Sequence, residues 1–339
     1  LRQDFSKIKN WADRSDFGFN EIEIEPEKLY AALSRSLSDL MNVCPKTIEK
    51  LAEFIDSGVD IETSLRTDTN EAGNARFSSC GWCPEECWQE GYLFAVEVLR
   101  LCSAQIDPME RFELLEILCA IQVIRSLCAQ SARYVEWEAP RKNLAEPLGY
   151  LFAISDPEGS HKALKQISRR SVSACERMIY DAIRNTHVKM NVDEQQRLDI
   201  ANGRKIQNIY KEADSRYGYK YFLSICKRIG MIIPRRGKGA RFIINEKILK
   251  LLILTVMRPG QRITYETFKR LVKLHYGMMF DDKDISMASQ WSGGPPILTL
   301  GGNADAWLME MLDAAGILIR LSDSCTLIVN PSDAIEEAR

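Results

Sequence analysis

Residues 219–245, YKYFLSICKRIGMIIPRRGKGARFIIN, change from a helical pattern to a β-prone pattern at Gly230. In the first half, apolar side chains recur three or four positions apart, which places them on one face of a predicted helix. These side chains are Phe222, Ile225, Cys226 and Ile229. Gly230 is predicted to end the helix because glycine readily takes a positive φ angle. Two apolar runs on either side of the turn-rich segment 234–241 then predict a β-hairpin.

Cations are concentrated on the surface that this pattern predicts. On the predicted helix, they lie away from the apolar face at Lys220, Lys227 and Arg228. In the predicted hairpin turn, they are Arg235, Arg236, Lys238 and Arg241. A helix fits the major groove of DNA, and a basic hairpin tip can reach phosphates. We therefore predict that all of these side chains bind DNA, with the turn residues extending from the hairpin.

The pattern of helix, glycine and hairpin occurs a second time toward the C-terminal end. Gly316 corresponds to Gly230, and Asn330 closes the second hairpin where Asn245 closes the first. Such an internal repeat indicates two copies of one supersecondary unit. Residues 160–330 therefore resemble tandem winged-helix proteins, a superfamily whose members bind DNA or dock proteins. The alternative interpretation is two unrelated helix–hairpin units in one α-rich domain.

Charge distinguishes the two copies. Residues 160–245 contain 19 Lys+Arg and 7 Asp+Glu, although the whole chain has a formal net charge of −2. This concentration favours contact with a polyanion over a basic face that meets only solvent. The second helix and hairpin have Arg320 as their only base and carry the acids Asp305, Glu310, Asp313 and Asp323. Because this charge would repel DNA, we predict that the second unit contacts protein.

The sharpest local motif is CGWCPEEC at residues 80–87, which places Cys80, Cys83 and Cys87 at the predicted start of a helix. A helix N-terminus favours the thiolate form that binds metal. We predict a structural zinc ion, ahead of an iron–sulfur cluster, with Cys44 as the fourth ligand. Other candidates for the fourth ligand are Cys119, Cys128 and His161. The competing interpretation is three partly buried free thiols.

No catalytic constellation stands out in the sequence. It contains no P-loop, no GxGxxG motif after a strand and no GxSxG motif. His161, His187 and His275 each fall in a helical pattern and are assigned to the surface or the core. The acidic run 281–284 is assigned to a solvated turn, because it lacks the strand and lysine partner of a metal-dependent nuclease. The sequence therefore favours a protein without catalytic activity.

Helical periodicity and helix caps predict a mainly α protein. Asp107 is predicted to cap a long helix that ends at about Tyr134. The predicted units are a helical domain with the cysteine motif over 1–159, a basic winged helix over 160–245, and a second winged helix with a Gly- and Pro-rich insertion over 246–339.

Cysteine use and hydropathy predict where the protein acts. Cysteines lie mostly on apolar helical faces, which suits a reducing compartment, and no run of 18 apolar residues could span a membrane. We therefore predict a cytoplasmic protein. The winged-helix resemblance implies a non-enzymatic DNA-binding subunit of a larger bacterial-type complex for DNA processing, restriction, phage defence or regulation. Its partners would be double-stranded DNA and a protein held by the second winged helix. The alternatives are a structural adaptor that docks acidic proteins or RNA, and an iron–sulfur-dependent enzyme.

Overall fold

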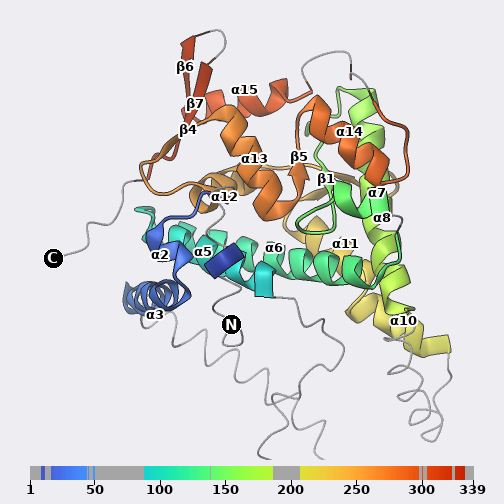
Figure 1. Cartoon of the computed structure of the whole chain (residues 1–339), viewed down its shortest axis with the longest axis horizontal. Helices are drawn as coiled ribbons and strands as arrows, with labels where there is room; N and C mark the ends of the chain where they lie inside the picture. Colours follow the sequence, from blue (N-terminus) through green and yellow to red (C-terminus); the bar gives the residue numbers. More distant parts are fainter. Residues whose placement is uncertain are drawn as a thin grey trace, which may run out of the picture.

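The described chain is mainly helical with a few short strands, as the sequence predicted (Figure 1). The computed structural model describes residues 9–11, 17–43, 45, 49, 88–137, 139–185, 207–297, 300, 304–322 and 325–332. The helices are α2 (Glu21–Ile24), α3 (Pro26–Val43), α5 (Trp88–Ser103), α6 (Pro108–Tyr134), α7 (Ala139–Leu144), α8 (Lys162–Ile183), α10 (Gln207–Arg216), α11 (Tyr219–Arg228), α12 (Glu246–Val256), α13 (Tyr265–Tyr276), α14 (Asp282–Trp291) and α15 (Ala306–Ala314). The strands are β1 (Phe152–Ala153), β2 (Ile232–Ile233), β3 (Arg241–Phe242), β4 (Arg262–Thr264), β5 (Met278–Met279), β6 (Leu318–Ser322) and β7 (Cys325–Val329).

The long helix α6 lies at the centre of the structure, and its predicted bounds are confirmed (Figure 1). Asp107 begins it by accepting hydrogen bonds from the backbone N–H groups of Met109 at 2.9 Å and Glu110 at 3.2 Å. Helix α6 packs against α5, α8 and α11. The helix that carries the predicted DNA-binding cations is therefore supported directly by the central helix.

The first predicted helix–glycine–hairpin unit is present. Helix α11 ends before Gly230, which has φ +78°, and the N–H of Met231 then donates to the carbonyl of Cys226 at 2.8 Å. Strands β2 and β3 pair antiparallel, with Ile232 opposite Phe242. A side-chain carbon at Gly230 would lie 2.6 Å from Asn245 Nδ2, so both the φ angle and the close approach require glycine here.

The second helix–glycine–hairpin unit repeats this backbone geometry. Gly316 follows α15 with φ +68°, and the N–H of Ile317 donates to the carbonyl of Leu312 at 3.0 Å. Strands β6 and β7 pair antiparallel, but β4 adds a third strand to this sheet in the order β4-β7-β6. The β6–β7 hairpin projects from the body of the structure (Figure 1). The local unit is thus repeated, while its surroundings differ.

The hydrophobic core continues across the boundary that the sequence placed near residue 159. Strand β1 pairs in parallel with β5, so that Phe152 lies opposite Met278. Buried apolar side chains from before and after residue 159 belong to one cluster. The Gly- and Pro-rich insertion of the second predicted unit, residues 278–303, contains the helix α14. This helix forms because Asp281 caps its first turn and Trp291 is completely buried.

Three buried thiols mark the place where α6, α8 and α11 meet. Cys128, Cys175 and Cys226 are each inaccessible to solvent. Burial raises the pKa values of Cys175 and Cys226, so both side chains remain neutral thiols that pack as small apolar groups. The predicted apolar role of the helical cysteines is confirmed here and for Cys102, whereas Cys119 is exposed.

Two buried ion pairs on α5 connect it to distant elements. Arg125 contacts both carboxylate oxygens of Glu97 at 2.7 and 2.8 Å, and Glu97 also lies 2.9 Å from the ring nitrogen Nδ1 of His275 in α13. Arg100 contacts Glu23 at 2.6 and 2.8 Å. It also donates to the carbonyl of Val256 at 2.8 Å, at the end of α12. These contacts join the N-terminal helices to the C-terminal half.

We predict that Glu97→Gln lowers the free energy of unfolding by roughly 3–5 kcal/mol at neutral pH, because it leaves the Arg125 guanidinium buried without its counter-ion. Burial disfavours the Glu97 carboxylate, but Arg125 and His275 outweigh that effect and lower its pKa below 4.5. The lowered folded-state pKa means that ionised Glu97 stabilises the fold above about pH 4.5, and that this contribution is lost as the pH falls further.

Urea denaturation of the wild type and of Glu97→Gln between acidic and neutral pH measures the difference in their free energies of unfolding. This difference should shrink as Glu97 becomes protonated. Glu113→Gln is the matched control, because the Glu113–Lys247 ion pair is exposed and its loss should change stability little. If the difference in free energy of unfolding between Glu97→Gln and the wild type does not change with pH, Glu97 and Arg125 do not form an ionised pair.

Candidate nucleic-acid interface

Helix α11 buries one face and exposes the opposite one. Phe222 and Cys226 are fully buried against α8 and α6, which fixes the rotation of the helix. The predicted DNA-binding residues Lys220 and Arg228 are exposed, and Lys227 is half-buried. The amphipathic pattern therefore placed these cations correctly on the outer side of the helix.

The β2–β3 hairpin exposes three of its four predicted cations. Arg235, Arg236 and Lys238 are all exposed in the turn that joins the two strands. Among the described residues, no ion pair neutralises them, so their positive charge faces solvent. The hairpin tip thus presents three exposed cations, as the sequence predicted for the turn.

Arg241 does not extend from the hairpin, contrary to the prediction. Only 5% of the surface of Arg241 is exposed. The guanidinium donates to Ser155 Oγ at 2.6 Å and to the carbonyl oxygens of Asp156 at 2.5 Å and Pro157 at 2.7 Å. Burial lowers the pKa of Arg241 even though the charge of Asp156 opposes the shift. This arginine therefore fastens the hairpin to the 155–157 loop and is removed from the candidate interface.

Helix α8 adds one basic residue, Arg169, that was not predicted to belong to the interface. A side-chain carbon at Gly239 would lie 2.9 Å from Arg169 Nη2, so the exposed Arg169 lies beside the hairpin turn. On the same helix, burial raises the pKa of Glu176, and the nearby charge of Lys227 partly offsets this increase. The only sequence signal for Arg169 is the pair of adjacent arginines at 169 and 170, which precedes the hairpin by about 70 residues.

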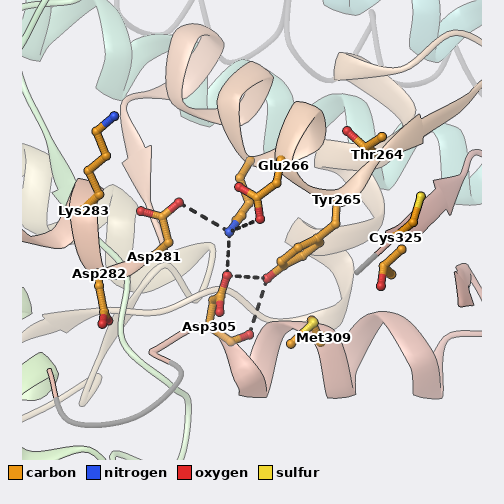
Figure 2. Close-up of a pocket in the computed structure, with 11 residues that line it drawn as sticks. Thr264, Tyr265, Glu266, Asp281, Asp282, Lys283, Asp305, Met309 and Cys325 are labelled. Atoms are coloured by element: carbon orange, nitrogen blue, oxygen red, sulfur yellow. Dashed lines mark hydrogen bonds and ion pairs between the residues drawn. The ribbon is translucent and has the colours of Figure 1, made fainter. Parts of the chain in front are cut away.

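A polar pocket of about 700 Å³ lies next to the second helix–hairpin unit (Figure 2). Lys269 lines the pocket and is almost completely buried. Its ammonium group lies 2.7 Å from Asp305 Oδ2, 2.9 Å from Glu266 Oε1 and 3.4 Å from Asp281 Oδ2. The hydroxyl of Tyr265 also donates to Asp305 Oδ2 at 3.0 Å. One lysine thus ties together α13, the start of α14 and the start of α15.

Two interpretations of the acidic residues around this pocket are wrong, those of Asp305 and of the run 281–284. Asp305 is buried in an ion pair, so it does not contribute to an acidic surface that repels DNA. The run 281–284 is not a solvated turn, because Asp281 caps α14 and Asp284 pairs with Lys273 at 2.8 Å. The sequence could not reveal these pairs, since the lysines lie on the preceding helix.

The chemistry of the pocket favours a structural role. Burial lowers the pKa of Lys269, but its hydrogen bonds to Asp305 and Glu266 outweigh this effect and raise it overall. The lysine therefore stays protonated at neutral pH and cannot act as a base. Burial and the charge of Asp305 raise the pKa of Tyr265, so its phenol is a poor acid. These groups position α15 and the hairpin that follows it.

The predicted metal ligands cannot be placed. Cys44, Cys80, Cys83 and Cys87 all lie outside the described residues, as does His187. Within the described ranges, no group of three or more His, Cys, Asp or Glu side chains has an arrangement that could hold a metal ion. Of the other candidate ligands, Cys119 is exposed, Cys128 is buried, and His161 caps α8 by accepting from the N–H of Leu164 at 3.3 Å.

We predict that Lys269→Met lowers the free energy of unfolding by about 3 kcal/mol, because it leaves the buried Asp305 carboxylate without a positive partner. Tyr265→Phe removes one hydrogen bond and should cost roughly 1–2 kcal/mol. Lys283→Met is the control, since Lys283 lines the same pocket but is exposed. Urea denaturation measures all three changes. Equal effects at Lys269 and Lys283 would show that the buried ion pair does not hold this region together.

The chain was compared with known protein families, curated proteins and solved structures, and its helices were searched for membrane spans. The described helices include none that is both long and apolar enough to cross a membrane. No protein-family model, no curated protein and no solved structure matches the chain.

Proposed function

We propose that this protein is a non-enzymatic DNA-binding subunit that contacts double-stranded DNA through α11 and the β2–β3 hairpin. The observation that carries the proposal is the shared exposure of Lys220, Arg228, Arg235, Arg236 and Lys238 on one helix–hairpin unit. Exposed cations without acidic partners can neutralise phosphates and release counterions, which is the main source of affinity for DNA.

Helix and hairpin have different tasks in this proposal. Because α11 buries Phe222 and Cys226, its outer face is free to enter a major groove, where Lys227 and Arg228 can approach base edges. The hairpin tip contacts phosphates, which position the protein without selecting a sequence. This division corresponds to the winged-helix arrangement that residues 160–330 resemble.

The second helix–hairpin unit is proposed to hold a protein partner. Its strand β6 lies at the edge of the three-stranded sheet, and there Ile319 is 37% and Leu321 is 61% exposed. Exposed apolar side chains on an edge strand favour pairing with another polypeptide. The protein would then act within a larger bacterial-type complex for DNA processing, restriction, phage defence or regulation. The alternative is an adaptor whose basic face docks an acidic protein or RNA.

We predict that replacing Arg235, Arg236 and Lys238 together with alanine reduces the salt dependence of DNA binding. Each lost phosphate contact lowers the slope of log K against log salt by about 0.9, so the slope should decrease by roughly two to three units. Affinity should fall about equally for all DNA sequences, because phosphate contacts do not specify bases. Fluorescence anisotropy with several duplexes over a range of salt concentrations measures both effects.

Two variants serve as controls for this measurement. Arg320→Ala removes an exposed arginine from the second hairpin and should leave DNA affinity nearly unchanged. Arg241→Ala removes a buried arginine and should lower the stability of the protein, which urea denaturation detects. Wild-type protein that shows no salt-dependent binding to duplex DNA would overturn the proposal and favour the adaptor. Equal losses from the Arg320 and hairpin variants would mean that the DNA-binding face is assigned wrongly.

The proposal for the cysteine motif is a structural zinc site formed by Cys80, Cys83, Cys87 and Cys44. Tetrahedral zinc held by four thiolates predicts one equivalent of zinc in purified protein. Cys83→Ser should lose the metal and lower the thermal midpoint, whereas Cys119→Ser should retain it. Elemental analysis measures the metal content. Iron with visible absorption would instead favour a cluster and the alternative of an iron–sulfur enzyme, and neither metal in untreated protein would exclude the site.

A further inference from the structure

A second basic surface lies where the end of α6 meets α7 and α8. Helices α7 and α8 lie on the right of Figure 1. A hollow of about 720 Å³ opens at this surface. Its lining includes the aromatic residues Tyr134 and Trp137. Four arginines line it as well: Arg141, Arg170, Arg177 and Arg184. Among the described lining residues, only Glu136 and Asp181 carry carboxylates, so positive charge exceeds negative charge there.

Three of these arginines share one face of α8 and its C-terminal end. Arg170, Arg177 and Arg184 are seven residues apart, which is close to two helical turns, so they form a row. At about 1.5 Å per residue, successive members of the row are roughly 10 Å apart along the helix. A regular row of guanidinium groups suits a ligand with repeated negative charges.

Tertiary contacts hold the ends of this arginine row. Arg184 makes a double contact with Asp214 of α10, at 3.0 Å to each oxygen, and its guanidinium carbon lies 3.4 Å from the centroid of the Tyr180 ring. At the other end, a side-chain carbon on Gly294 would lie 2.5 Å from Arg170 Nη1, so glycine leaves room for that guanidinium. Between them, Arg177 is 84% exposed and lies 3.6 Å from Asp181.

An arginine stacked on an aromatic ring forms the other wall. The guanidinium carbon of Arg141 lies 4.3 Å from the centroid of Trp137, and Arg141 Nε donates to the carbonyl of Trp291 at 2.9 Å. The rings of Trp137 and Trp291 are 5.1 Å apart. Guanidinium planes and aromatic rings are the surfaces on which proteins stack unpaired bases. The hollow therefore combines phosphate-binding groups with base-binding groups.

The hollow is continuous with the proposed DNA-binding surface. Ser173 and Arg177 line the hollow and also a shallow depression that reaches Tyr180 and Tyr219. Tyr219 is the first residue of α11, which carries the predicted DNA-binding cations. The depression is also lined by Glu176, so Arg177 is the one cation among its described lining residues, and a nucleic-acid strand that leaves the α11 surface can cross Arg177 to enter the hollow.

We propose that the hollow binds unpaired nucleotides at the end of the DNA that α11 holds, with phosphates on Arg170 and Arg177 and a base against the Trp137 and Arg141 wall. This inference rests on the proposed DNA-binding function and adds a substrate class to it: duplex DNA with a single-stranded tail. The separate positions of α11 and the hollow allow the two proposals to be tested apart.

The experiment compares two labelled DNAs, a blunt duplex and the same duplex with a short single-stranded tail placed at either end. Wild-type protein should bind the tailed DNA about tenfold more tightly, as expected for an added stacked base and phosphate contact. The double variant Arg170→Ala with Arg177→Ala should lose this preference and retain its affinity for the blunt duplex. The control pair Arg262→Ala with Arg320→Ala removes the same charge from the second sheet and should keep the preference.

Each outcome decides between the two proposals. A preference for tails that Arg170 and Arg177 variants abolish supports the hollow as the binding site. Because Arg177 is largely exposed, the single variant Arg177→Glu gives the same test without threatening the fold. Three outcomes would overturn the inference and leave the proposed function standing. They are binding to blunt duplex without any preference for tails, a preference that survives both variants, and variants that lose equal affinity for both DNAs. No binding to either DNA would overturn both.

Discussion

The buried pair between Glu97 and Arg125 imposes the strongest constraint on this structure. Both side chains are almost fully removed from water, so their charges are tolerated only where every polar atom finds a partner. Those partners include His275, which is about 180 residues from Glu97. The pair Arg100–Glu23 adds the same requirement less than one turn further along α5. The N-terminal and C-terminal parts must therefore assemble together before either set of charges is satisfied.

This joint assembly explains how the candidate interface is presented. Helix α11 rests on α6 and α8 through buried side chains such as Cys226, and the hairpin is fastened to the 155–157 loop by Arg241. Among the described residues, the exposed cations of α11 and of the hairpin turn make no ion pair of this kind. In the second unit, the same local geometry has a different use, because Lys269 and Asp305 fix α15 from within. Repeated backbone geometry thus carries two different distributions of charge.

The sequence by itself determined the local elements. Asp107 and Thr264 cap α6 and α13 through their own side chains, and Gly230 and Gly316 end helices with positive φ angles. Both hairpins follow from apolar runs on either side of turn residues. These features were predictable because each depends on residues within one or two helical turns, where spacing and backbone preference decide the conformation.

Only the tertiary structure decided which charged side chains are buried. Arg241 and Asp305 belong to segments predicted to be surface, yet both are buried, because their partners come from distant parts of the chain. Arg169 joins the candidate interface for the same reason, since folding brings α8 to the hairpin. A charge can be buried only when desolvation is offset by a precisely placed partner, and sequence spacing does not record that placement.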